Sequence, residues 1–392
     1  MASRRPDSFD GLGYRLAPDP QLQYRVTTPP DIPGSRNLHR SPQYEDPGAE
    51  AGAYRAAAGW DAPQPGLPPS EQLNRFAGFG IGLVSLFTEN VLAHPCIVFR
   101  RQCQVNVHAR CFHLTPFSAV SVMYSISKAQ GVRSLWKGMG STFIVHGVTL
   151  GAEGIISEFT PLPRELPHRW SWRQLAGHLL LKGLTAVVAL PFYCSSLIDT
   201  VQSEIVRDDS ASLLDCLREA LSRVLGIGAP HSRRLLPLSA LLFPAALHAV
   251  LKYCVSTCVQ RAALWLLQRR RKEEASDPLD SYFVDLASQW AGSLFSDVLC
   301  FPLETVLHRL ALQGTRTIID HTEQGGALQV LPVNTQYDGF SDCLSSVRHK
   351  EGAASFYRGV GALTAQYALH AALLALSRAA LRLAMDAKAL RA

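Results

Sequence analysis

Catalysis requires a nucleophile beside a base, or several metal ligands at short spacing, and neither arrangement stands out in this sequence. The chain has nine cysteines. None forms a Cys-x-x-Cys pair, and no histidine–cysteine cluster has the spacing of a zinc site. We therefore predict no catalytic residues, no metal and no enzyme activity.

Two acidic residues, Glu89 and Asp297, stand inside long apolar stretches. An ionisable group within a membrane-spanning helix is costly, so it usually faces a cavity or a partner. These acids could contact a substrate or a lipid headgroup. The plainer interpretation is a structural group that faces a cavity and forms local hydrogen bonds.

Two triplets, Trp136-Lys137-Gly138 and Tyr357-Arg358-Gly359, come directly before apolar segments. A helix N-terminus presents free N–H groups and the positive end of the helix dipole, which together suit a phosphate. The triplets are therefore candidate sites for an anionic phospholipid. They could equally be interfacial anchors, because aromatic and basic residues collect at membrane surfaces.

The composition favours a helical membrane protein over a soluble helical one only when it is combined with the pattern of apolar segments. Hydrophobic residues make up 47% and charged residues 18% of the chain, and the mean hydropathy is +0.06. Helices that face one another or a polar cavity give such a mixed signal, because only one face must suit lipid. The net charge of +6 is spread out and rarely interleaved with aromatic residues, which argues against nucleic-acid binding.

Residues 1–70 differ from the rest of the chain. They contain 12 prolines, 7 glycines and no lysine, and their apolar residues have no helical period. We predict a disordered tail that serves as a spacer or as a docking arm. Asp7, Asp10 and Asp19 argue against a cleaved mitochondrial presequence, and no apolar core suggests a secretory signal.

Three apolar segments that each end at a proline indicate an internal triplication. The segments span 72–94, 176–190 and 287–301, and the prolines are Pro95, Pro191 and Pro302. A proline inside a spanning helix removes a hydrogen bond and bends the helix. Residues 85–95 also parallel 293–302, and residues 130–138 parallel 351–359.

This triplication predicts repeats at about 72–165, 170–268 and 283–385, which together form one domain at 71–392. Each repeat offers a second apolar segment, at about 140–158, 235–266 and 360–384. Between the two segments of each repeat lies an amphipathic helix, at about 116–128, 212–224 and 339–349. These helices are expected to lie along the membrane surface. The third repeat also carries a polar insertion within 315–336.

The proline segments and the later acid–glycine, aromatic–basic–glycine patterns resemble the signature of the mitochondrial carrier family, solute carrier family 25. The resemblance covers about 72–385. It implies an all-α membrane protein with six transmembrane helices in three pseudo-repeats of about 100 residues. It further implies cardiolipin as the lipid at the triplets, and no other cofactor.

Carriers of this family close one end with ion pairs between an acid and a base that follow each proline. Here the acid positions are Ile97, Tyr193 and Glu304, and the base positions are Arg100, Ser196 and Leu307. The resemblance implies that Arg100 and Glu304 form one residual pair. We find no complete second gate near Ser157-Glu158, Tyr253-Cys254 or Ser377-Arg378, so alternating access is disfavoured.

A closer likeness, to an atypical outer-membrane branch of the family, is carried by residues 9–14, 27–38 and 70–101. It implies a multi-pass protein of the mitochondrial outer membrane that acts in fission–fusion balance, cristae organisation and lipid exchange. The implied partners are membrane lipids, the mitochondrial fusion GTPases and the cristae-organising complex. The alternative is a divergent solute or lipid transporter.

Overall fold

The computed structural model describes residues 84, 87–164, 171–205, 213–225, 235–271, 278–315, 317–320, 322 and 330–389. The predicted tail at 1–70 and residues 72–83, 85 and 86 of the first apolar segment lie outside this range. All described residues belong to one compact unit, Gly48–Ala392.

The first repeat begins with a break in the helix at its proline. Its elements are η2 (Thr88–Leu92), α3 (His94–Val105), α4 (Pro116–Gln130), η3 (Val132–Trp136) and α5 (Met139–Phe159). Pro95 lies in the first turn of α3, where its missing N–H costs little. Thr115 caps α4, because its hydroxyl accepts the Ser118 N–H.

The second and third repeats contain longer helices. Their elements are α6 (Trp172–Val201), α7 (Leu213–Leu225), α8 (Leu238–Arg271), α9 (Pro278–Leu312), β1 (Ile318–Asp320), β2 (Val330–Pro332), α10 (Phe340–Ser346), η4 (Val347–Glu351), η5 (Ala353–Tyr357) and α11 (Val360–Ala389). Pro191 and Pro302 lie inside α6 and α9. The helices predicted after each proline segment are confirmed as α5, α8 and α11, and the amphipathic ones as α4, α7 and α10.

Among the described residues, four helical stretches are long and apolar enough to cross a membrane. They are Val132–Phe159, Trp172–Val201, Leu238–Arg269 and Ala353–Leu383. Helix α9 has 35 residues, which is long enough, but it falls short in apolar character. The count of six spans is therefore not confirmed. Residues 72–83 of the first predicted span are not described.

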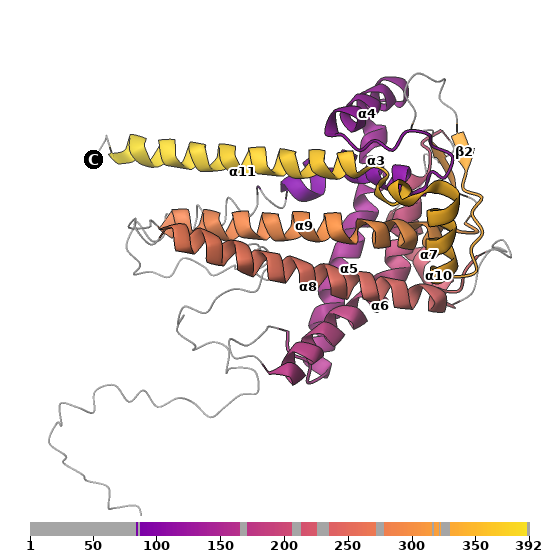
Figure 1. The fold of residues 1–392 in the computed structure, drawn as a ribbon, viewed down its shortest axis with the longest axis horizontal. Helices are drawn as coiled ribbons and strands as arrows, with labels where there is room; N and C mark the ends of the chain where they lie inside the picture. The colour runs from indigo at the N-terminus through magenta and orange to yellow at the C-terminus, as the bar shows by residue number, and fades with distance from the viewer. Residues whose placement is uncertain are drawn as a thin grey trace, which may run out of the picture. The chain divides into compact units, whose positions relative to one another are not determined.

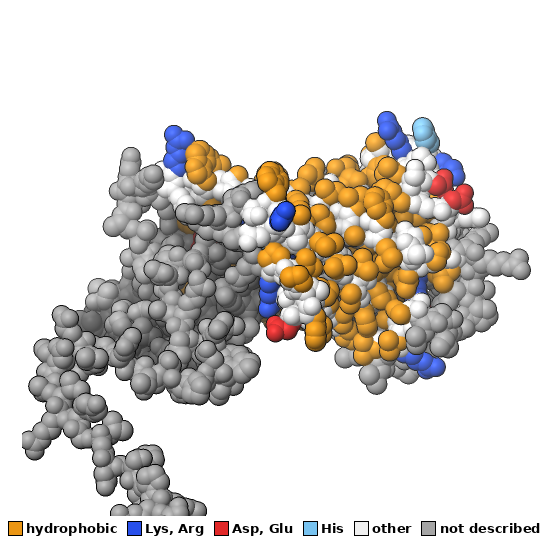
Figure 2. Space-filling model, turned by 90° about the horizontal axis from the view of Figure 1, so that it is seen from below, with side chains coloured by type: hydrophobic (Ala, Val, Ile, Leu, Met, Phe, Trp, Pro, Cys, Tyr) orange, Lys and Arg blue, Asp and Glu red, His pale blue; other side chains and the backbone are white. Residues whose placement is uncertain are grey.

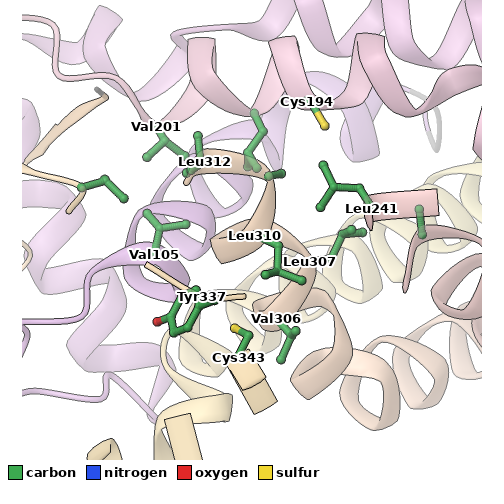
Figure 3. Packing of buried hydrophobic residues seen from close by; sticks show 14 of the residues in the cluster. Val105, Cys194, Val201, Leu241, Val306, Leu307, Leu310, Leu312, Tyr337 and Cys343 are labelled. Atoms are coloured by element: carbon green, nitrogen blue, oxygen red, sulfur yellow. The ribbon is translucent and has the colours of Figure 1, made fainter. Parts of the chain in front are cut away.

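The strongest packing joins helices that are neighbours or near neighbours in the sequence. Helix α8 packs along α9, α5 along α6, and α6 against α8; Figure 1 shows α8 and α9 side by side. The largest core cluster of the described residues takes members from all three predicted repeats, among them Val105, Leu197, Leu241 and Leu310. The triplication itself stays a prediction. Figure 3 shows this cluster, with Cys343 of α10 among its members.

One face of the described helices is largely apolar (Figure 2). Figure 2 shows a face on which hydrophobic side chains gather with few charged ones between them. Phe159, Phe243 and Leu299 are examples of apolar side chains that are more than half exposed. A face of this kind suits contact with lipid, in agreement with the four apolar helices.

The polar insertion of the third repeat is ordered as a hairpin in its described part. Strands β1 and β2 are antiparallel, with Ile319 opposite Leu331. Ile319 also bridges to Gln202, just after α6. Residues 316, 321 and 323–329 of the insertion lie outside the described part of the chain.

Candidate functional site

The residual gate pair joins α3 to α9. Arg100 Nη2 lies 3.2 Å from Glu304 Oε1, and both side chains are nearly buried. Gln104, one turn further along α3, donates to Glu304 Oε2 at 3.1 Å. Residues four apart share a helix face, which is why Arg100 and Gln104 reach the same carboxylate. The structure thus brings together the two residues that the sequence assigned to one gate pair.

The other gate positions carry no charge of their own, and the Arg101 guanidinium lies 5.6 Å from the centre of the Tyr193 ring. The Tyr193 hydroxyl lies 2.5 Å from His308 Nε2, and the Ser141 hydroxyl donates to the Ser196 hydroxyl at 3.2 Å. Leu307 belongs to the main core cluster and is 3% exposed. Where the family has charged pairs, this chain therefore has packed side chains that are shielded from water.

The Tyr357-Arg358-Gly359 triplet is held by its own repeat and by α3. Arg358 Nη1 lies 3.0 Å from Glu351 Oε2 and donates to the Val107 carbonyl at 3.1 Å. Glu351, the acid of the predicted acid–glycine pattern, also accepts from Arg309 Nη2 at 3.0 Å. Arg358 is therefore buried in an ion-pair network and does not reach outward.

The Trp136-Lys137-Gly138 triplet is likewise turned inward. Trp136 Nε1 donates to the Val91 carbonyl at 2.8 Å. Lys137 Nζ donates to the Gln202 carbonyl at 2.7 Å and lies 3.0 Å from Asp320 Oδ2. Since the side chains of Lys137 and Arg358 are both engaged within the protein, a lipid phosphate at the triplets would have to be bound mainly by backbone N–H groups.

Of the two predicted acids within apolar segments, Asp297 is part of a polar group among α8, α9 and α11. Lys252 Nζ lies 2.7 Å from Asp297 Oδ1, and the Tyr367 hydroxyl donates to Asp297 Oδ2 at 2.7 Å. The side chain of Lys252 is 45% exposed, so this pair is accessible from one side. The side chain of Glu89, in η2, lies outside the described residues.

A further, nearly buried ion pair, which the sequence interpretation missed, joins α5 to α6. Lys182 Nζ lies 3.1 Å from both carboxylate oxygens of Glu153. The same ammonium group sits 5.2 Å from the centre of the Tyr253 ring on α8. The sequence did contain a signal for these lysines, because Lys182 and Lys252, like Asp297, are charged residues within predicted apolar segments.

Asp320 is the most connected acid among the described residues, and the sequence offered little to find it. It accepts hydrogen bonds from Gln102, Gln130, Lys137 and Ser203, and it is 1% exposed. Burial alone would raise its pKa, but Lys137 and the hydrogen bonds from Ser203 and Gln130 outweigh burial and lower the pKa below its ordinary value. Lys137 lies 183 residues away in sequence, so spacing could not pair the two.

No group of three histidine, cysteine, aspartate or glutamate residues in the described part of the chain could hold a metal ion. The polar clusters described above are instead ion pairs and hydrogen bonds between helices. Such clusters can orient helices and hold them together.

The comparisons with known proteins agree with this architecture. The family model described as mitochondrial carrier protein matches residues 71–158 and 280–385. The chain is 57% identical over 410 residues to the mitochondrial outer membrane protein SLC25A46 of Danio rerio, which covers 96% of this chain and 98% of that protein. It is 54% identical over 413 residues to the protein of that name from Homo sapiens, which covers 96% of this chain and 97% of that protein.

A third relative is solute carrier family 25 member 46-A of Xenopus laevis. It is 52% identical over 412 residues, covering 96% of this chain and 97% of that protein. The described helices, the glycine-terminated triplets and these identities over nearly the full length all lead to one assignment. The chain belongs to the mitochondrial carrier family.

Proposed function

We propose that this chain is a carrier-like scaffold or adaptor of the mitochondrial outer membrane, without enzyme activity and with degenerate transport gates. The observation that carries the proposal is the state of the gate positions. Of the three family pairs, Arg100–Glu304 alone can be formed from charged residues. Ser196 and Leu307 stand where two bases would be.

Reopening of this end would be costly. The two charges of an ion pair can separate because water hydrates each of them, whereas exposing a buried leucine to water costs free energy. Opening this end would expose Leu307, Leu310 and Val306, which are all at most 3% exposed. A carrier that alternates must open and close this end repeatedly. The packed gate therefore favours a single, closed arrangement.

Location and role are proposed from the relatives. The Danio rerio and Homo sapiens relatives are named as mitochondrial outer membrane proteins, and four apolar helices of this chain fit membrane insertion. By resemblance, the scaffold would act in the balance of mitochondrial fission and fusion, in cristae organisation and in lipid exchange. Its partners would be the fusion GTPases, the cristae-organising complex and membrane lipids, including cardiolipin or another anionic phospholipid.

Protease protection on intact mitochondria, with an epitope on the N-terminal tail, tests the location. We expect the epitope to be lost while the outer membrane is intact. Small metabolites already cross that membrane through porins, so a gated carrier there would be redundant. Loss only after rupture of the outer membrane would place the chain in the inner membrane and make transport the leading hypothesis.

Deletion of the tail tests the role. If residues 1–70 dock partners, their removal should change mitochondrial shape while the rest of the chain stays folded and inserted in the membrane. The matched control replaces residues 1–70 with a flexible Gly/Ser linker of equal length, which preserves reach but not sequence. Normal mitochondrial shape with both variants would count against a docking arm.

A divergent transporter is the second candidate, and one observation favours it. Lys252, Asp297 and Tyr367 form a polar group on three helices, and the lysine is accessible. Purified chain in liposomes that exchanges a solute, with exchange abolished by Asp297→Asn but kept by Asp338→Asn on the exposed connection, would establish transport. Absence of exchange for a broad set of solutes would count against transport and favour the scaffold.

A further inference from the structure

The two ends of the insertion in the third predicted repeat are joined by hydrogen bonds. Gln313, at the end of α9, donates to the Tyr337 carbonyl at 2.9 Å and accepts the Tyr337 N–H at 2.8 Å. The Val333 N–H donates to the Thr317 carbonyl at 2.9 Å, next to the paired strands. The hairpin therefore leaves and rejoins the third predicted repeat at one point.

One side chain of the hairpin makes most of these outer contacts. Asp320 Oδ2 accepts from Gln102 of α3 and from Lys137, each at 3.0 Å. Asp320 Oδ1 accepts from Gln130 of α4 at 3.0 Å and from the Ser203 hydroxyl, just after α6. A single carboxylate, 1% exposed, thus joins the first repeat, the second repeat and the third.

Further contacts fix the hairpin on both sides of Asp320. The Ser203 N–H donates to the Ile318 carbonyl at 2.8 Å, and Ile319 is 2% exposed within the main core cluster. On the other side, Asn106 Nδ2 donates to the Thr322 hydroxyl at 3.3 Å and His113 Nε2 donates to the Thr322 carbonyl at 2.8 Å. Polar and apolar contacts thus act on the same ends of α3 and α6.

These ends lie beyond the family gate positions, of which Ile97 and Ser196 no longer carry charges. We propose that the hairpin is an intramolecular strap that holds the C-terminal ends of α3 and α6 to α9, in place of the lost ion pairs. The strap goes beyond the proposed function, because it would restrain a scaffold and a transporter alike. Its contacts are hydrogen bonds, one ion pair and the buried side chain of Ile319. Water can replace the polar contacts but not the apolar one.

Amide hydrogen exchange of the full chain in lipid nanodiscs tests the strap, because it reports local opening of each element. The variant is Asp320→Asn, and the matched control is Asp338→Asn, an exposed acid in the same connection. In Asp320→Asn we expect the exchange rate to rise at least about tenfold in the hairpin, at the end of α3 (102–106) and at the end of α6 (198–203). A tenfold rise corresponds to the free energy of one lost charge-assisted hydrogen bond. Exchange in α8 should stay unchanged, and Asp338→Asn should match the wild type.

An increase confined to the hairpin would overturn the proposal, because the helix ends would then be held by other contacts. No increase anywhere would overturn it as well. If Asp320→Asn fails to fold, the double variant Asn106→Cys with Thr322→Cys provides the second measurement. Its disulfide should form on oxidation and slow exchange at both helix ends, and failure to form or to slow exchange would contradict the strap.

Discussion

Lys137 and Asp320 form an ion pair at 3.0 Å in which the two side chains are 2% and 1% exposed. Burying two charges is costly, and removal of one partner leaves the other uncompensated. The pair also connects a family motif to an insertion that the family motif does not contain. The contribution of this pair to the free energy of unfolding can be measured directly.

Replacement of Lys137 with methionine should destabilise the protein by roughly 3–5 kcal/mol, because Asp320 loses its charged partner while it remains buried. The matched control is Lys128→Met on exposed α4, which should stay within about 0.5 kcal/mol of the wild type. Denaturant unfolding in detergent, followed by helical signal, gives both values. Equal midpoints for the two variants would contradict this prediction.

Stability should also depend on the ionisation of Asp320. Its folded-state pKa is lower than its unfolded value, so its contribution is fully present above the unfolded pKa of about 3.9 and is lost as the pH falls through the folded pKa. We expect the wild type to lose stability more steeply than Asp320→Asn below about pH 4. Thermal unfolding between pH 3 and pH 7 gives the two slopes, and parallel curves would argue against this role.

The Arg100–Glu304 pair should behave as a unit. Arg100→Glu or Glu304→Arg alone places like charges together at a nearly buried site, and each should cost roughly 3–5 kcal/mol. The double swap should recover a substantial part of that loss. A double-mutant cycle of unfolding free energies measures the coupling. Additive losses without rescue would show that the two charges do not stabilise each other.

Gly359 should tolerate alanine less well than Gly352 does. Both have positive φ, +82° and +88°, so the backbone strain is matched. A Cβ at Gly359 would lie 2.8 Å from Cys103 Cβ, whereas a Cβ at Gly352 would meet nothing within 4 Å. Gly359→Ala should therefore lower the melting temperature by several degrees more than Gly352→Ala, as about 1 kcal/mol of extra overpacking implies.

If instead the two glycine variants have the same melting temperature, α3 and the start of α11 can move apart at little cost in free energy. Such a result would also argue that Arg358 is not held firmly by the carbonyls of Asn106 and Val107, just after α3. Gly131→Ala offers a further control in the first repeat, because it too has positive φ and open space around it.

The sequence predicted the local elements well because their signals are local. Prolines, glycines and apolar period placed α5, α8 and α11, as well as the amphipathic helices, close to their observed bounds. The Arg100–Glu304 partnership could be proposed from a family pattern. The Lys182–Glu153 pair could not, since no motif links the two residues and their partnership depends on how α5 packs on α6.

The sequence by itself determined the family and the loss of charges at the gate and predicted the helical repeats, because these depend on residue types at fixed spacing. Only the tertiary structure decided what replaced those charges. It placed Asp320 of the insertion against Lys137, Gln102, Gln130 and Ser203. Contacts over such separations arise when helices from three repeats pack around one buried carboxylate, and no local pattern encodes that meeting.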